Sequence, residues 1–132
     1  MAKQFRLLIV DDDAGVRDVT SEIFVEVGYE VETAVDGADA LRVVDTFQPD
    51  LLITDLRMPG MSGFELLVIV RERFPQLPVI AISGEYAGDS LPEGVIADAF
   101  LCKGEYPISR LRNTVAQLLA VAPKRDSQRL RL

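Results

Sequence analysis

The chain has 132 residues, of which 48% are hydrophobic and 27% are charged. This length and composition predict one globular domain rather than a disordered chain. Its net charge of −7 argues against direct nucleic acid binding, and the absence of histidine excludes catalysis and phosphoryl carriage by imidazole. A single cysteine excludes an internal disulfide. We see no membrane span and no signal peptide, so we expect a cytoplasmic location without a membrane partner.

Short apolar runs alternate along the chain with segments of helical periodicity. We interpret the runs as strands, at residues 5–10, 30–35, 51–54, 79–82 and 100–102. Apart from residues 30–35, which alternate with polar residues, these runs are continuous. Continuous runs of this length are typical of strands that are buried on both faces of a parallel sheet.

The intervening segments carry apolar stripes with helical spacing. The stripe of the first segment comprises Val16, Val19, Ile23 and Val27. Gly28 provides a stop for this helix, and similar stripes occupy residues 40–47 and 108–118. Ser62 is suited to cap another helix, which we expect to run to about residue 73.

The strand–helix pair is predicted five times, which indicates an α/β fold with helices on both faces of a parallel sheet. We expect a flavodoxin-like, doubly wound, five-stranded sheet with strand order 2-1-3-4-5. The fourth helix, between Ser83 and Phe100, should be irregular because this segment contains several glycines and a proline. We assign residues 1–122 to this domain. Residues 123–132, with four basic residues and one acid, form a basic tail or a truncated linker.

Polar side chains stand at the carboxyl ends of four predicted strands. Residues 11–13 are all aspartate and follow the first strand, whereas Asp55, Ser83 and Lys103 follow the third, fourth and fifth. These four strands are neighbours in the predicted order, and sites in open α/β sheets form at the carboxyl ends of the strands. We therefore expect three carboxylates, a hydroxyl and an ammonium to converge. Each residue alone has a simpler interpretation as a turn residue, a helix cap or a solvated charge.

Carboxylates that lie close together repel one another unless a cation is present. A site with oxygen ligands and no histidine or cysteine favours Mg²⁺, with Mn²⁺ or Ca²⁺ as alternatives. An ionised aspartate is also a nucleophile that needs no general base, and its attack on phosphorus forms an aspartyl phosphate. The lysine and the metal would neutralise charge on the transferred group.

The residues around Asp55 resemble a known family signature. The sequence DLRMPGMSG at residues 55–63, together with LLIVDDD at residues 7–13, resembles the receiver domain of two-component response regulators, and the resemblance covers about residues 4–121. It implies that Asp55 is the phosphoacceptor. It also implies a Mg²⁺ site made by Asp12 as direct ligand, Asp11 as its partner, Asp55, and the backbone carbonyl of Arg57.

The resemblance also assigns roles near the last two strands. Ser83 matches the hydroxyl residue that contacts a phosphoryl oxygen, and Lys103 matches the lysine that pairs with another oxygen. Phe100 matches an aromatic switch residue, which fills the space that Ser83 vacates when its hydroxyl moves toward the phosphoryl group. Arg57 and Glu85 would flank the path of the water that attacks the phosphorylated aspartate.

The implied function is a signalling switch, rather than a conventional enzyme, that promotes its own phosphorylation and dephosphorylation. Asp55 would receive a phosphoryl group from the phosphohistidine of a histidine kinase or a histidine phosphotransfer protein, in a Mg²⁺-dependent reaction. The face formed by the fourth strand, the fourth helix and the fifth strand would then change shape. The output would pass to a downstream protein partner or to an output domain missing from this sequence, and a homodimer is an open alternative.

Two other interpretations compete with this one. The family usually has proline after the lysine, often with a cis peptide, but Gly104 follows Lys103 here. This departure leaves open a receiver-like module that binds proteins without phosphorylation. The run Asp11-x-Asp13 also resembles the start of haloacid-dehalogenase-type phosphatases, with Asp11 as the nucleophile. Against it, Gly15 replaces the Thr or Val of that motif, and Asp55 is left without a role.

Overall fold

The structure is a computed structural model that describes residues 4–84, 97–103 and 107–121. Its elements alternate along the chain as β1 (Arg6–Val10), α1 (Ala14–Val27), β2 (Glu30–Ala34), α2 (Gly37–Phe47), β3 (Leu51–Asp55), α3 (Gly63–Arg73), β4 (Val79–Ser83), β5 (Ala99–Cys102) and α4 (Ile108–Ala120). No helix in the described part of the chain is long and apolar enough to cross a membrane.

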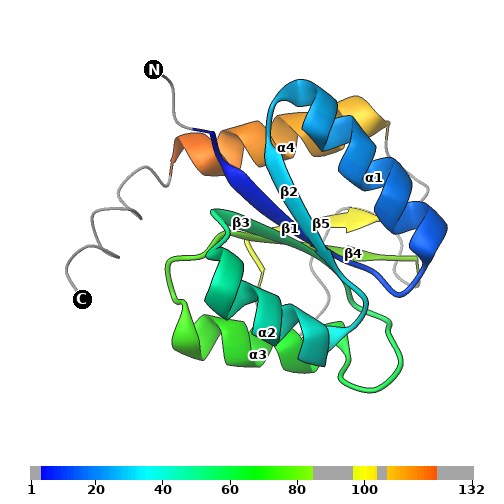
Figure 1. The fold of residues 1–132 in the computed structure, drawn as a ribbon, viewed down its shortest axis with the longest axis vertical. Coiled ribbons are helices and arrows are strands. Elements are labelled where there is room, and N and C mark those ends of the chain that lie inside the picture. The colour runs from blue at the N-terminus through cyan, green and yellow to red at the C-terminus, as the bar shows by residue number, and fades with distance from the viewer. Residues whose placement is uncertain (1–3, 85–96, 104–106, 122–132) are drawn as a thin grey trace.

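The five strands form one parallel sheet with the order β2-β1-β3-β4-β5, which confirms the predicted topology. Helices α1 and α4 cover one face of the sheet, and α2 and α3 cover the other (Figure 1). Side chains alternate between the two faces, so Leu7 and Ile9 pack in the core beside α1 and α4, whereas Leu8 and Val10 pack beside α2 and α3. All five residues of β3 and of β4 are buried, as expected for continuous apolar runs between two helix layers.

The apolar stripe predicted for the first helix was wrong in part. Val19 and Val27 are 59% and 50% exposed, and Phe24 is the buried residue of α1. A fully buried phenylalanine removes more apolar surface from water than a valine, so α1 is rotated to place Phe24 against the sheet. The predicted end of this helix is confirmed, because Gly28 adopts a left-handed conformation with φ of 118°.

The helix after β3 begins where the sequence indicates, since the Ser62 side chain accepts a hydrogen bond from the Glu65 amide.

Helix α4 of the structure is the last of the five predicted helices. The segment predicted as an irregular fourth helix lies largely in residues 85–96, outside the described residues. Gly104, Glu85 and the tail at 123–132 also lie outside them.

Gly63 lets the start of α3 approach the end of β3. A Cβ atom at this position would clash with the Asp55 carbonyl oxygen and would lie 2.6 Å from the Leu56 Cα atom. Both neighbours are backbone atoms, so they cannot rotate away. The Gly63 amide also donates a hydrogen bond to the Leu56 carbonyl at 3.1 Å, which secures the same contact. The loop between them, which follows Asp55, therefore depends on a residue without a side chain.

We expect Gly63→Ala to destabilise the fold by ~2–3 kcal/mol, because the added methyl group must push α3 away from β3. The matched control is Gly84→Ala, whose added Cβ would meet Lys103 at 3.7 Å, an ordinary contact. The control should stay within ~1 kcal/mol of wild type. Urea unfolding followed by circular dichroism measures both variants, and equal losses for the two would contradict the close-approach explanation.

Candidate functional site

Four polar residues meet at the carboxyl edge of the sheet. Asp55 and Ser83 are the last residues of β3 and β4, while Asp11 and Lys103 directly follow β1 and β5. Since these strands are neighbours in the order β1-β3-β4-β5, the predicted adjacency of their ends is present in the structure. Asp11, Asp55 and Ser83 are buried, with 5%, 5% and 0% of their surface exposed.

Lys103 connects the two buried carboxylates. Its Nζ atom lies 2.9 Å from Asp55 Oδ2 and 3.4 Å from Asp11 Oδ2. Burial lowers the pKa of Lys103, but the hydrogen bond that Lys103 donates to Asp55 and the charges of Asp11 and Asp55 outweigh it and leave that pKa above its usual value. The backbone amide of Lys103 also donates to the Ser83 carbonyl at 2.9 Å, which extends the β4–β5 pairing to the site.

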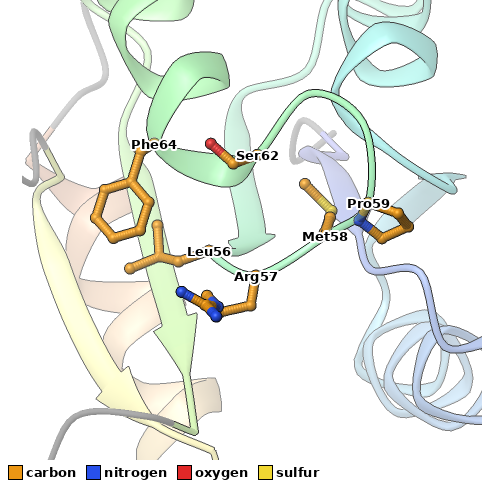
Figure 2. Close-up of a pocket in the computed structure, with 6 residues that line it drawn as sticks. All are labelled: Leu56, Arg57, Met58, Pro59, Ser62 and Phe64. Carbon is orange, nitrogen blue, oxygen red and sulfur yellow. The ribbon is translucent and has the colours of Figure 1, made fainter.

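The second Asp55 oxygen faces the loop that leads to α3. The Arg57 amide donates to Asp55 Oδ1 at 3.0 Å, so both carboxylate oxygens have a donor. A pocket of about 530 Å³ lies beside this loop, lined by Leu56, Arg57, Met58, Pro59, Ser62 and Phe64 (Figure 2). The Asp55 carboxylate is therefore held in one orientation from both sides.

Asp11 is held through four of its polar atoms. Its amide donates to the Ala34 carbonyl, its carbonyl accepts from Arg17, and its carboxylate accepts from the Asp13 amide and from Lys103. Burial raises the pKa of Asp11, and the charge of Asp55 acts in the same direction. The hydrogen bond from Asp13 and the charge of Lys103 oppose this shift without cancelling it.

The three aspartates at 11–13 have different surroundings. Asp13 caps α1, because its Oδ1 atom accepts a hydrogen bond from the Val16 amide at 3.1 Å. Asp11 and Asp12 instead join Asp55, and one carboxylate oxygen of each lies within 4.8 Å of the others. Ligand distances of roughly 2.0–2.6 Å let a single hard cation bridge oxygens at about this spacing. Asp12 is exposed and leaves the cluster open to solvent, so the donor set fits a divalent ion.

Phe100 is buried on β5, an edge strand of the sheet. It is 4% exposed and packs in the core beside α2 and α3, in register with Ala81 on β4. Ser83 is on the same strand as Ala81, two residues further toward the site. Phe100 and Ser83 are thus on adjacent strands and both buried.

Two residues contribute to the site in ways that were not predicted from the sequence. The capping role of Asp13 has a sequence signal, since an aspartate directly before a helix is a preferred cap. Arg17 donates a hydrogen bond to the Asp11 carbonyl at 2.7 Å, which the sequence did not predict. Its only signal is a basic residue one helical turn after the cap, which is common on solvated helix faces.

The sequence matches the response regulator receiver domain family over residues 7–113. The chain belongs to this family. Among its relatives, the transcriptional regulatory protein GlrR of Escherichia coli is 39% identical over 95 residues, which cover 72% of this chain and 21% of that protein. The regulator of RpoS of Escherichia coli is 41% identical over 78 residues, or 59% of this chain and 23% of that protein. The chain therefore spans about a fifth of the length of these relatives.

Solved receiver structures share the fold of this domain. The response regulator TrrA of Thermotoga maritima, in complex with Mg²⁺ and BeF, is 30% identical and has a TM-score of 0.79. The match covers 87% of this chain and 99% of that one. The chemotaxis response regulator CheY4 of Vibrio cholerae is 31% identical, with a TM-score of 0.77 and coverage of 88% and 99%. Receiver domains are signalling switches rather than conventional enzymes.

The raised pKa of Asp11 predicts a pH-dependent effect of Asp11→Asn in the presence of EDTA. An acid whose pKa is raised by folding binds its proton more tightly in the native state, so its contribution to stability falls as the pH rises above its ordinary value of 3.8. The neutral amide keeps an acceptor for the Asp13 amide and removes the buried charge. We expect a higher urea midpoint than wild type near pH 7, and a gain that shrinks toward about pH 4.5.

The control for this pH series is Asp45→Asn, which removes an exposed carboxylate on α2. It should change the midpoint little at either pH, since exposed charges contribute little to stability. An Asp11→Asn midpoint below that of wild type by the same amount at both pH values would show that the buried charge does not destabilise the metal-free fold.

Proposed function

We propose that this receiver domain is a phosphorylation-driven switch whose phosphoacceptor is Asp55. The observation that carries the proposal is the pairing of the buried Asp55 carboxylate with Lys103, beside a cluster of carboxylates that fits one divalent cation. The chain contains no histidine, so the phosphoryl donor is a phosphohistidine on a partner, either a histidine kinase or a histidine phosphotransfer protein. In vitro, a small phosphodonor such as acetyl phosphate would replace the partner.

In this mechanism an Asp55 carboxylate oxygen forms the new bond to phosphorus. The bond between phosphorus and the partner's imidazole nitrogen breaks, and that nitrogen keeps the electron pair. The Arg57 amide and Lys103 hold the Asp55 carboxylate in place before the reaction. Holding the nucleophile in one orientation removes part of the entropic barrier to an in-line attack.

Lys103 has a second role once transfer begins. Its ammonium pairs with Asp55 in the resting protein, and it can pair with a phosphoryl oxygen when the carboxylate oxygen is used for the new bond. The Ser83 hydroxyl, at the end of the neighbouring strand, contacts another phosphoryl oxygen. Phe100, on the next strand, then moves into the space near Ser83 and changes the β4–β5 face.

Asp11, Asp12, Asp55 and the backbone carbonyl of Arg57 would hold Mg²⁺, or Mn²⁺ in its place. The bound ion supplies positive charge that offsets the repulsion between the carboxylates and the incoming phosphoryl group. The oxygen-only donor set within 4.8 Å supports this choice of ion. Asp11 and Asp55 already share Lys103, so the site has one positive partner before a metal binds.

We further propose that residues 1–122 form the receiver unit, that residues 123–132 are a tail or linker, and that the protein acts in the cytoplasm. The output passes to a downstream protein or to a domain beyond this sequence. The GlrR relative, of which this chain matches 21%, is named a transcriptional regulatory protein, which supports an output domain outside the receiver unit.

Asp55→Asn should abolish the gain of one phosphoryl group that the wild-type protein shows with acetyl phosphate and Mg²⁺. The amide keeps the shape of the side chain but is not an anionic nucleophile. Intact-protein mass spectrometry measures the gain, and Asp45→Asn, which alters an exposed carboxylate on α2, is the matched control and should react at the wild-type rate.

Mapping the modified peptide separates this mechanism from its alternatives. Label on Asp55 supports the receiver mechanism, whereas label on Asp11 supports the phosphatase-like alternative. A wild-type protein that gains no phosphoryl group and binds neither Mg²⁺ nor beryllofluoride would instead be a receiver-like binding module. An Asp55→Asn variant that reacts as fast as wild type would refute the assignment of the phosphoacceptor.

A further inference from the structure

Arg17 reaches from α1 back to the end of β1. Its Nη1 atom donates a hydrogen bond to the Asp11 backbone carbonyl at 2.7 Å, and the side chain is half-buried. A distance this short is typical of a charge-assisted hydrogen bond. A guanidinium on a helix surface ordinarily extends into solvent, so a contact with a strand-end carbonyl needs an explanation beyond solubility.

The contact is one of several hydrogen bonds that link residues 11–13, the acidic loop after β1, to the first turn of α1. The Asp11 side chain accepts from the Asp13 amide at 2.9 Å, the Asp13 side chain accepts from the Val16 amide at 3.1 Å, and Arg17 returns to the Asp11 carbonyl. The Arg17 amide also donates to the Asp13 carbonyl at 3.0 Å, as part of the helix. The first turn of α1 is therefore linked to the loop after β1 by backbone and by side-chain hydrogen bonds.

Asp12 lies between two backbone groups that these hydrogen bonds hold. The peptide unit before it contains the Asp11 carbonyl, which Arg17 holds. The peptide unit after it contains the Asp13 amide, which the Asp11 carboxylate holds. Fixing both peptide planes fixes the two backbone dihedral angles of Asp12 and so the direction in which its exposed side chain leaves the backbone. Asp12 is the exposed member of the carboxylate cluster, so its direction depends on this support.

We propose that Arg17 is a positioning residue for the divalent-cation site: its hydrogen bond to the Asp11 carbonyl orients Asp12 toward Asp11 and Asp55. This inference rests on the proposed metal site. Groups that orient metal ligands typically change metal affinity by ~10–100-fold when they are removed. Arg17 touches no reacting atom, so it acts through the loop that carries the ligand.

The sign of the effect distinguishes positioning from a simple charge effect. Arg17 is a cation near a cation site, so loss of its charge alone would strengthen Mg²⁺ binding. Loss of its hydrogen bond would weaken binding, because Asp12 would sample directions that face away from the site. Replacing arginine with methionine removes both the charge and the donor, and replacing it with lysine keeps a charge and a donor without the planar fork.

The test compares wild type, Arg17→Met and Arg17→Lys by calorimetric titration with Mg²⁺. Urea unfolding curves, recorded first, identify a temperature at which all three proteins are folded. We expect Arg17→Met to raise the Mg²⁺ dissociation constant by ~10-fold and Arg17→Lys to recover part of the loss. The matched control is Arg73→Met, which removes an exposed cation from the last turn of α3 and should bind like wild type.

Two further readouts separate positioning from a general structural role. With acetyl phosphate, Arg17→Met should need more Mg²⁺ for half-maximal phosphorylation but should approach the wild-type rate when Mg²⁺ is saturating. In the metal-free protein, the amide resonances of Asp12 and Asp13 should shift more in Arg17→Met than in Arg17→Lys.

An Arg17→Met protein that is folded and binds Mg²⁺ as tightly as wild type, or more tightly, overturns the inference and leaves the proposed function intact. A wild-type protein that binds no Mg²⁺ overturns the proposed metal site itself, and the inference with it.

Discussion

The site depends on the placement of one ammonium between two buried carboxylates. Lys103 binds Asp55 and Asp11 across separations of 48 and 92 residues, so the contact exists only when the whole sheet has formed. A buried carboxylate without a partner is costly, and Lys103 reduces this cost for both. One cation shared by two anions still leaves a local excess of negative charge, to which Asp12 adds. Burial is the main cause of the raised pKa of Asp11, and the excess of negative charge makes the cluster suited to a further cation.

The fold supplies this arrangement through its parallel strands. Each strand enters the sheet from the same side, so the residues that end β1, β3, β4 and β5 gather at one edge whatever their distance along the chain. Local features then refine the geometry. Gly63 lets α3 start directly against the end of β3, and Arg17 joins α1 to the end of β1. The packed core positions the strands, while these loops determine how the carboxylates face one another.

Much of this could be predicted from the sequence, because its signals are local. Continuous apolar runs predicted the buried strands, and Gly28 and Ser62 predicted helix ends that the structure confirms. The face that α1 buries was not predictable from spacing alone, because competition between Phe24 and the valines is decided by packing. The hydrogen bond from Arg17 to a backbone carbonyl has no compositional signature, so it required coordinates. The roles of Ser83 and Phe100 in switching stay predictions.

A crystal structure of the protein with Mg²⁺ and beryllofluoride tests the shared phosphoacceptor site most directly. We expect beryllium bonded to a carboxylate oxygen of Asp55, with Lys103 and Ser83 contacting its fluorides, and one Mg²⁺ bound between Asp12 and Asp55. Beryllofluoride on another residue, or a Mg²⁺ ion that contacts Asp12 but not Asp55, would contradict the claim that these acids form one phosphoacceptor site.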